Sequence, residues 1–321
     1  MTEGDKPLIS IVTGCFNEEH NVGPLYERLC KVFESLPKYR FEIICIDNHS
    51  TDGTVAALKD IARSDTRLKI IVNARNFGHV RSPYHALLQA HGAAVVVMAS
   101  DLQDPPELIP EFVSKWEAGF KVVMGQKTKS QESFLFRVLR TGYYRIVGRL
   151  SDIALVEHAT GFGLYEQRVI EDLRRIDDPY PYMRGLVCDL GYERALVEFV
   201  QPNRLRGLTK NNFYTLYDMA MLGITNHSKV PLRLATMSGF AAAALSFVVG
   251  FAYLIAKLVF WQSFTLGTAP VVVGLFFFAS VQLFFTGVLG EYIGSIHTQV
   301  LKRPLVIEQE RVNFDAETST R

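Results

Sequence analysis

Two long runs without charged residues lie near the end of the chain and constrain its fold more than any other feature. Leu234 to Ala256 contains no charged residue, and neither does Leu258 to Gly290; only Lys257 separates them. A transmembrane helix needs roughly 20 apolar residues, whereas buried helices of soluble proteins more often have apolar runs of roughly 10 to 14. The sequence therefore predicts two membrane spans, at about residues 233–258 and 269–293, in preference to a buried helical hairpin.

The charges beside these runs predict an orientation. Lys229 and Arg233 precede the first run, and Lys302 and Arg303 follow the second. Basic residues next to short spans stay on the cytoplasmic side of the membrane. The first six residues are polar and do not resemble a signal peptide. We therefore expect a multi-pass protein of the inner (plasma) membrane, held in the lipid bilayer, with its large N-terminal part in the cytoplasm.

Composition argues against several other classes of protein. Of the 321 residues, 48% are hydrophobic, and 34 basic residues balance 33 acidic ones. This balance indicates neither a disordered chain nor a protein that binds nucleic acid. The cysteines form no CxxC pair, so we expect reduced thiols and neither a disulfide framework nor a structural zinc site. They are Cys15, Cys30, Cys45 and Cys188.

Apolar runs alternate with helical stretches in the first hundred residues. The expected strands are residues 8–16, 41–46, 68–72 and 93–99, and the expected helices are residues 22–36, 55–62 and 84–92. This alternation predicts an α/β fold, with a mostly parallel sheet and helices on both faces. Ligands of such sheets bind beyond the carboxyl ends of the strands. The polar clusters NEE, DNHSTD and SDLQD, which follow three of the strands, are therefore expected at one edge.

The segment VMASDLQDPPE, residues 97–107, contains the most informative of these clusters. An apolar strand ends there in acidic and amide side chains, and two prolines prevent a helix from starting at once. Hard divalent cations such as Mg²⁺ or Mn²⁺ prefer oxygen ligands and complete their shell with phosphate oxygens. Asp101 and Gln103, at alternate positions, are candidate ligands of a metal bound to a diphosphate. A turn capped by Asp101 is the alternative that the local chemistry leaves open.

Six motifs in order carry a resemblance to a known family. They are SIVTGCFNEEHNV, IICIDNHSTDGT, ARNFGHV, SDLQDPPELI, RLRGLTK and VLGEYIG. With its two spans, the chain resembles the family-2 glycosyltransferases of the GT-A (Rossmann-like) fold, specifically the dolichyl- and undecaprenyl-phosphate sugar transferases. The resemblance implies inverting transfer of a hexose-type sugar from a UDP- or GDP-linked donor to polyprenyl (undecaprenyl) phosphate, for a cell envelope glycan.

The resemblance also implies roles for particular residues. Asp101 is expected to be catalytic and, with Gln103, to bind Mg²⁺ or Mn²⁺. The side chains expected beside the nucleotide sugar are Asn17, Glu18, Asp47, Asn48, Arg75 and His79. The cations expected to face the phosphates are Lys127, Lys129, Arg204 and Lys210. For His79 a structural role is the alternative, and for the lysines and Arg204 the alternative is simple solvation.

The expected organisation has four parts. They are a cytosolic GT-A domain at residues 1–210, an amphipathic juxtamembrane segment at 211–230, a transmembrane hairpin at 231–297 and a cytosolic tail at 298–321. Within the second part, residues 213–224 predict a helix lying in the headgroup layer, with a core helix as the alternative. A homo-oligomer is also expected through small residues of the first span, which lipid packing explains equally well: Gly239, Ala243 and Gly250.

Several positions depart from the family's usual pattern. The usual DxD begins here with Ala99, and the second acid of the usual DDGS is Asn48. In the segment that usually reads GDFRL, the Asp generally assigned as catalytic base is Gly161, and the Arg is Gly163. Glu157 is a candidate substitute for the missing acid, with a surface role as the alternative.

The missing base does not exclude catalysis. A phosphate monoester has a second pKa near 6, so the acceptor oxygen is largely ionised at neutral pH. The enzyme's main tasks are then alignment of the reactants and stabilisation of the departing nucleotide diphosphate. Two alternatives stay open: a catalytically impaired membrane scaffold or regulator with the same fold, and a processive polysaccharide synthase. The absence of a QxxRW segment and the presence of only two spans argue against the synthase.

Overall fold

The computed structural model describes residues 6–129, 159–202, 221, 230–260 and 268–314. Strands and helices alternate from the first described residues onward. The first half contains β1 (Leu8–Cys15), α1 (Glu19–Ser35), β2 (Arg40–Asp47), α2 (Thr54–Ser64), β3 (Leu68–Asn73), α3 (Gly78–Leu88), β4 (Ala94–Ala99), the short 3₁₀ helix η2 (Pro106–Leu108) and α4 (Ile109–Glu117). The second half contains β5 (Val122–Lys129), β6 (Ala159–Glu166), α6 (Gln167–Ile176), α7 (Met183–Asp189), β7 (Arg194–Val200), α9 (Val230–Val259), α10 (Thr268–Leu301) and β8 (Glu308–Val312).

The described strands form one sheet in the order β7-β5-β6-β4-β1-β2-β3-β8. Its centre, from β4 through β1 and β2 to β3, is parallel. β6 is antiparallel to both β4 and β5, so β5 again points in the direction of the central strands, as does β7 beside it. The predicted mostly parallel α/β sheet is confirmed.

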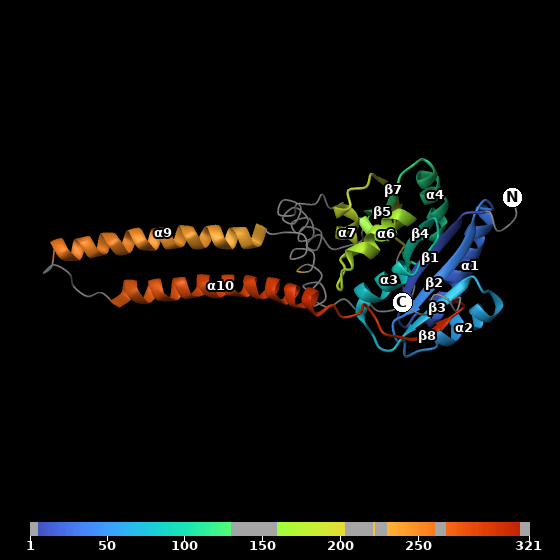
Figure 1. Ribbon diagram of the computed structural model, residues 1–321, viewed down its shortest axis with the longest axis horizontal. Helices are drawn as coiled ribbons and strands as arrows, with labels where there is room; N and C mark the ends of the chain where they lie inside the picture. Colours follow the sequence, from blue (N-terminus) through green and yellow to red (C-terminus); the bar gives the residue numbers. More distant parts are fainter. Residues whose placement is uncertain (1–5, 130–158, 203–220, 222–229, 261–267, 315–321) are drawn as a thin grey trace. The chain divides into compact units, whose positions relative to one another are not determined.

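Helices cover both faces of the sheet, as predicted. α1, α2 and α4 lie on one face, and α3, α6 and α7 lie on the other (Figure 1). In β2, Ile43 and Cys45 belong to the first core, and Ile44 and Ile46 belong to the second. A strand buried on both faces needs an apolar side chain at nearly every position, which explains the continuous apolar runs in the sequence. Each fully buried side chain of this kind contributes roughly 1.5–3 kcal/mol.

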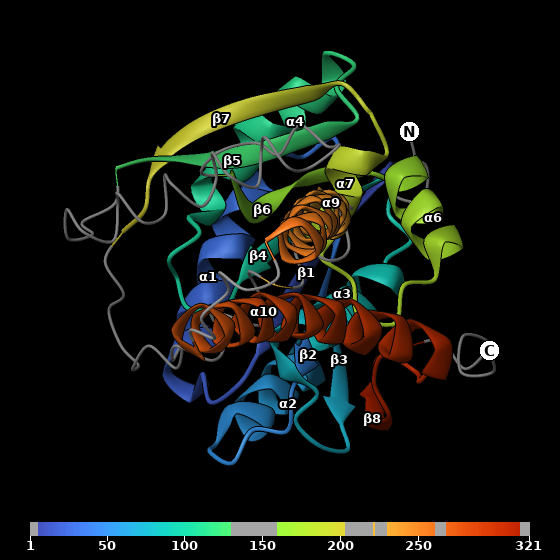
Figure 2. The same ribbon diagram turned by 90° about the vertical axis from the view of Figure 1, so that its left-hand side faces the viewer.

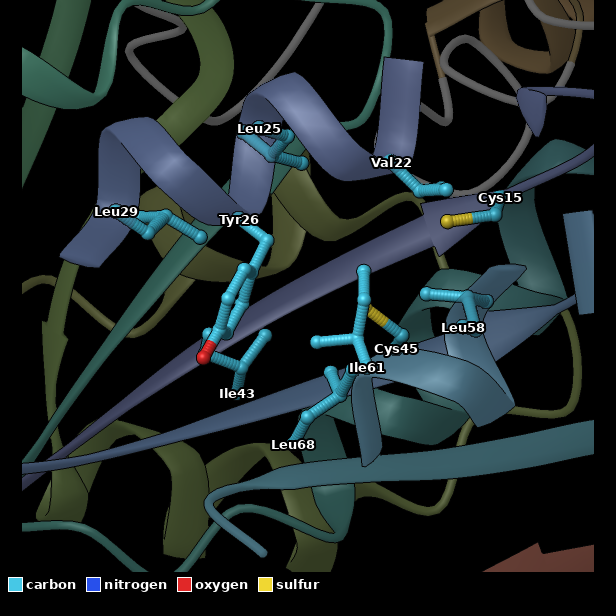
Figure 3. A pocket seen from close by; sticks show the side chains of 10 residues that line it. All are labelled: Cys15, Val22, Leu25, Tyr26, Leu29, Ile43, Cys45, Leu58, Ile61 and Leu68. Carbon is cyan, nitrogen blue, oxygen red and sulfur yellow. The ribbon is translucent and has the colours of Figure 1, made fainter. Parts of the chain in front are cut away.

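A small cavity lies between α1, α2 and the sheet (Figure 3). Its volume is about 10 Å³, and its lining is Cys15, Val22, Leu25, Tyr26, Leu29, Ile43, Cys45, Leu58, Ile61 and Leu68. Since one water needs roughly 10–15 Å³, no substrate fits there. All four cysteines are free thiols. A hydrogen bond with the Cys15 thiol, together with burial, raises the pKa of the Cys45 thiol. The space that these ten side chains line is therefore closed core.

The C-terminal tail adds a strand that the sequence analysis did not anticipate. β8 pairs antiparallel with β3 at one edge of the sheet, as both overall views show (Figures 1 and 2). Ala74 N donates to Ile307 O at 2.9 Å, and Asn313 Nδ2 donates to the carbonyls of Ala62 and Leu68, each at 2.9 Å. The tail is thus part of the same compact unit as the N-terminal sheet.

Two helices of the described chain are long and apolar enough to cross a membrane. They contain candidate spans at Val230–Tyr253 and Gly274–Leu301, with mean hydropathies of 1.8 and 1.4. Apart from the last residue of the second span, both lie in a second compact unit. The predicted spans fall inside α9 and α10, and α10 continues beyond the predicted end at residue 293 as far as Leu301.

Candidate active site

The carboxyl ends of the central parallel strands meet at one edge of the sheet, here called the rim (residues 16–18, 47–52, 74–79 and 99–104). Cys15, the last residue of β1, is paired with Asp47 of β2. On its other side, Gly14 is paired with Ala99 at the end of β4. The clusters NEE, DNHSTD and SDLQD therefore come together, as the sequence predicted.

The chain leaves three of these strands through an unusual backbone conformation. Asn17, His49 and Leu102 have φ angles of 58°, 65° and 62°, and Gly78 after β3 has 89°. Asn and His adopt this left-handed region fairly readily, but for other side chains it costs roughly 1–2 kcal/mol. Such strained residues persist where the surrounding structure imposes them, and they cluster at active sites. Three of the six non-glycine residues with positive φ in the described part of the chain lie at the rim.

The loop after β4 is held in a defined shape. Ala99 N donates to Asp104 Oδ2 at 2.9 Å, and Ser100 Oγ donates to Gly14 O at 2.9 Å. Gln103 N donates to Asp101 Oδ1 at 3.2 Å. The side chains of Asp101 and Gln103 are half-buried.

Asp104 is a rim residue to which the sequence analysis gave no role. Its carboxyl group is buried. Burial, reinforced by the charge of Asp101, raises its pKa to about 6, although the hydrogen bond from Ala99 and the charge of Lys127 both act to lower it. Asp104 thus lies within electrostatic reach of both Asp101 and Lys127. The second acid in DLQD was the signal in the sequence, but only the fold shows that its side chain turns inward.

Asn48 is buried under the loop that joins β3 to α3. Its Nδ2 donates to Asn76 Oδ1 at 2.9 Å and to Gly78 O at 3.2 Å. Its Oδ1 accepts from Phe77 N at 2.8 Å and from Asn73 Nδ2 at 3.2 Å. The amide therefore uses both its donor and its acceptor capacity to hold this loop.

Asn17 and Asp47 join the loops that follow β1 and β2. Asn17 N donates to Ser50 Oγ at 2.9 Å, and Thr51 N donates to Asn17 Oδ1 at 2.8 Å. Asp47 is fully buried and accepts from the backbone N of Ser50 at 2.9 Å and from its hydroxyl. Beside them, Glu18 Oε2 accepts from the amide of Asn21 at 2.5 Å. These contacts fix the shape of the rim.

The other predicted site residues fall into two groups. Arg75 and His79 are exposed on the rim after β3, and Lys127 lies near the carboxyl end of β5. Lys129 is the last residue of that strand. Because β5 points in the direction of β4, its end lies at the same edge as the acidic loop. The remaining candidates are outside the described residues: Glu157, Arg204 and Lys210.

The glycines at 161 and 163 have opposite surroundings in β6. A Cβ added at Gly161 would meet no atom within 4 Å, so a side chain there has open space. A Cβ at Gly163 would lie 2.4 Å from the carbonyl oxygen of Val123 on the adjacent β5. Gly163 is therefore required by the close approach of two strands. At Gly161, an acid is absent although it would fit.

The oxygen ligands at the rim fit a divalent cation that is shared with a phosphate ligand. Two carboxylates, Asp101 and Asp104, interact through their charges, and the amide of Gln103 stands between them in the sequence. No group of three or more His, Cys, Asp or Glu side chains suited to a metal occurs within the described residues. Mg²⁺ is usually held by only one or two carboxylates together with substrate phosphates and water, so the carboxylate of Asp101 with the amide oxygen of Gln103 would be sufficient.

A sheet that is parallel at its centre, with acidic and amide side chains at its carboxyl edge, is the architecture of a GT-A glycosyltransferase. The chain belongs to glycosyl transferase family 2, whose pattern it matches over residues 10–174. The resemblance inferred from the six motifs is thereby confirmed. The protein is a glycosyltransferase.

Known relatives span nearly the whole chain. An uncharacterized glycosyltransferase of Bacillus subtilis, YkcC, is 35% identical over 95% of this chain and 94% of its own length. The SfII prophage-derived bactoprenol glucosyl transferase of Shigella flexneri is 33% identical over 93% of this chain and 96% of its own length. Among solved structures, glucosyl-3-phosphoglycerate synthase from Mycobacterium tuberculosis covers 70% of this chain and 79% of its own, with 17% identity and a TM-score of 0.46. That last similarity is too low to support an inference about function.

Proposed function

We propose that this enzyme transfers a hexose-type sugar from a nucleotide-sugar donor to polyprenyl phosphate at the cytoplasmic face of the membrane, with inversion at the anomeric carbon. The observation that carries the proposal is the 33% identity to a bactoprenol glucosyl transferase over 93% of the chain. Such similarity extends through both apolar helices, so it includes the part that would meet a lipid acceptor.

The donor, UDP- or GDP-linked, is placed by this proposal at the rim. Asn17 and Glu18 would lie beside the nucleotide, and the exposed Arg75 and His79 would approach its phosphates. Asp47 and Asn48, which are buried and hydrogen-bonded within the protein, would shape the loops that receive it.

Asp101 and Gln103 would hold Mg²⁺ or Mn²⁺ at the rim. The cation would neutralise charge on the nucleotide diphosphate as it leaves. Both side chains are half-buried on a loop fixed by the Asp104 and Ser100 hydrogen bonds, which supports a preformed site. Asp104 would position the loop from its buried place behind the two ligands.

The acceptor phosphate would meet Lys127 and Lys129, with Arg204 and Lys210 as further cations. One oxygen of the acceptor attacks the anomeric carbon, a new bond forms between that oxygen and the sugar, and the bond from the sugar to the nucleotide diphosphate breaks. Since the acceptor arrives largely ionised at neutral pH, no side chain has to remove a proton. The open space at Gly161 is consistent with a reaction that needs alignment more than a base.

The proposal places α9 and α10 across the bilayer, with the GT-A domain in the cytoplasm. Basic residues flank both ends of the hairpin at positions 229, 233, 302 and 303, and the segment between the helices is uncharged from residue 262 to 268. This distribution follows the positive-inside rule.

A transfer assay tests the proposal. The purified full chain is incubated with a panel of radiolabelled nucleotide sugars, a divalent metal and undecaprenyl phosphate, and the lipid product is extracted. We expect a labelled lipid phosphate sugar from at least one donor, and no product when the metal is removed by a chelator.

The variant Asp101→Asn sharpens this test. We expect at least about a 100-fold lower turnover, because an ionic partner of the leaving group is lost, with unchanged membrane insertion. Asp60→Asn, on the exposed surface of α2, is the matched control and should keep wild-type turnover. Wild-type activity in Asp101→Asn would refute the metal assignment; absence of transfer from every donor would refute the proposed function.

A further inference from the structure

Arg75 and Arg81 lie beside the ring of Phe77, and Arg81 also contacts Pro304, the third residue after the end of α10. The guanidinium carbon of Arg75 lies 4.0 Å from the centroid of this ring, and that of Arg81 lies 5.7 Å from it. Burial, and then the charges of Arg75 and Arg303, lower the pKa of Arg81. The positive charge of Arg81 therefore lies within electrostatic reach of the charges of both Arg75 and Arg303.

The described contacts of this cluster do not neutralise its charge. Arg81 Nη2 donates to the carbonyl of Pro304, and Arg75 Nη1 donates to the carbonyl of Asn76 at 3.0 Å. Both acceptors are uncharged. Arg81 Nε is buried and has no hydrogen-bond partner in the described part of the chain. Among the ion pairs that join described residues, none includes Arg75, Arg81 or Arg303.

Chain connectivity brings these residues close to the end of the second apolar helix. α10 ends at Leu301, and Pro304, which accepts from Arg81, is the third residue after it. Three residues span at most about 10 Å. If α10 crosses the bilayer, as the proposed function has it, Arg81 and Arg303 therefore lie at the level of the lipid headgroups.

We propose that Arg81 and Arg303 bind the phosphate group of a membrane lipid, with the charge of Arg75 reinforcing the site. The inference rests on the proposed function for its membrane setting. Guanidinium groups donate paired hydrogen bonds to phosphate oxygens, and such charge-assisted bonds are about twice as strong as neutral ones. The contact of Arg81 with Phe77 and Pro304 holds its guanidinium in place before the phosphate arrives. The lipid is either an anionic phospholipid, through its headgroup, or the polyprenyl phosphate itself.

Lipid titration of the purified full chain in detergent tests this site. Phosphatidylglycerol and undecaprenyl phosphate are titrated separately, and diacylglycerol serves as a lipid without phosphate; bound lipid is counted by native mass spectrometry. We expect Arg81→Gln and Arg303→Gln each to weaken phosphate-lipid binding by about tenfold, the effect of losing roughly 1.5 kcal/mol of charged hydrogen bonding. Arg63→Gln, an exposed arginine of α2, is the matched control and should bind as wild type does.

The two lipids identify the source of the phosphate. Weaker phosphatidylglycerol binding with an unchanged KM for undecaprenyl phosphate assigns the site to a headgroup. Weaker undecaprenyl phosphate binding with a raised KM assigns it to the acceptor. Unchanged affinity for both lipids in Arg303→Gln, whose exposed side chain has no structural role among the described contacts, would overturn the inference.

Two further comparisons keep folding and function separate. Arg81→Lys retains the charge without the paired donors and should bind with intermediate affinity at an unchanged melting temperature. Lipid counting does not need catalysis. A wild-type chain that binds phosphatidylglycerol but transfers no sugar would refute the proposed function and leave the lipid site standing.

Discussion

Asn48 shows how the surroundings of one residue explain a departure from the family pattern. The usual second acid of the motif would place a carboxylate oxygen against Asn76 Oδ1 and Gly78 O, which are both acceptors. In this chain an amide is needed there, since it donates to those two oxygens and accepts from Phe77 N. The change of residue is thus a requirement of the loop, and it does not by itself indicate a lost activity.

Asn48→Asp is expected to destabilise the protein. It places a buried carboxylate against the two oxygens to which Asn48 donates, Asn76 Oδ1 and Gly78 O, and removes both hydrogen bonds, at a cost of about 2 kcal/mol or more. For a domain of this size that lowers the melting temperature by about 4 to 8 °C. Thermal unfolding of the purified chain measures the change, with Asp60→Asn, an isosteric exchange on the surface, as the control. Equal melting temperatures for Asn48→Asp and wild type would contradict the hydrogen-bond assignment.

Gly161 and Gly163 give a paired prediction about the segment that usually reads GDFRL. Gly161→Asp should fold normally because its side chain enters open space, whereas Gly163→Ala should be destabilised because its Cβ meets the Val123 carbonyl. A general base contributes typically 10²- to 10⁴-fold. Since the proposed acceptor, a phosphate monoester, is largely ionised at neutral pH, we expect Gly161→Asp to change turnover at pH 7 by less than about tenfold. An increase of a hundredfold or more would show that the reaction lacks a base.

At the scale of elements, the most consequential feature is β8. This strand covers the edge of the sheet beside β3 and connects the end of α10 to the rim side of the sheet, because Glu308 is paired with Asn73 at the end of β3. Its side chains contact two helices: His85 Nε2 of α3 lies 2.6 Å from Glu308 Oε1, and Lys59 Nζ of α2 lies 2.7 Å from Glu310 Oε2.

Glu308 should make the attachment of β8 dependent on pH. Burial opposes its ionisation, but hydrogen bonds from His85 and Arg311 outweigh burial and lower its pKa from 4.5 to about 2. Because the pKa of Glu308 is lower in the folded protein than in the unfolded chain, its ionisation stabilises the folded protein at pH values above the unfolded pKa. That contribution is full above about pH 4.5 and is lost as the pH falls toward 2.

Comparison of Glu308→Gln with wild type measures this contribution. The variant should melt at a lower temperature at pH 7, and the difference should shrink steadily between pH 4.5 and 2. Glu310→Gln removes a surface pair of the same strand and should change the melting temperature only slightly. A difference for Glu308→Gln that does not depend on pH would contradict the role of its charge.

At the scale of the whole molecule, two chemistries are combined in one chain. The α/β sheet carries a polar rim. The two apolar helices, α9 and α10, have exposed hydrophobic side chains along their length. Exposed apolar surface of this extent is stable in lipid and not in water. An enzyme that joins a water-soluble sugar donor to a lipid acceptor needs both environments.

Cysteine labelling tests the orientation of the hairpin. In Ser263→Cys the new thiol lies in the uncharged segment of the sequence between α9 and α10, and we expect an impermeant maleimide to label it in intact cells. Arg63→Cys places a thiol on exposed α2 of the GT-A domain and should be labelled only after the membrane is opened. Labelling of Arg63→Cys in intact cells would show that the GT-A domain lies outside the cytoplasm and would contradict the proposed orientation.

Local sequence was sufficient for the central elements and for the two long apolar helices. The strands at residues 41–46, 68–72 and 93–99 were predicted to within a residue or two, because buried parallel strands require continuous apolar runs. The helix expected at residues 84–92 was wrong at both ends, because α3 begins at Gly78 and ends at Leu88. Contacts from Asn48 and Asn76 fix that start, and such contacts are not visible in local periodicity.

The sequence by itself determined the α/β class, the convergence of three polar clusters at one edge, and two apolar helices, since each depends on local patterns of apolar and polar residues. The family followed from motifs in order. Only the tertiary structure showed that the Asp104 carboxyl group is buried and that the Asn48 amide uses both its donor and its acceptor in hydrogen bonds. It also showed that the close approach of β5 requires glycine at position 163, and that the polar tail forms β8. Each of these depends on atoms brought together from distant parts of the chain.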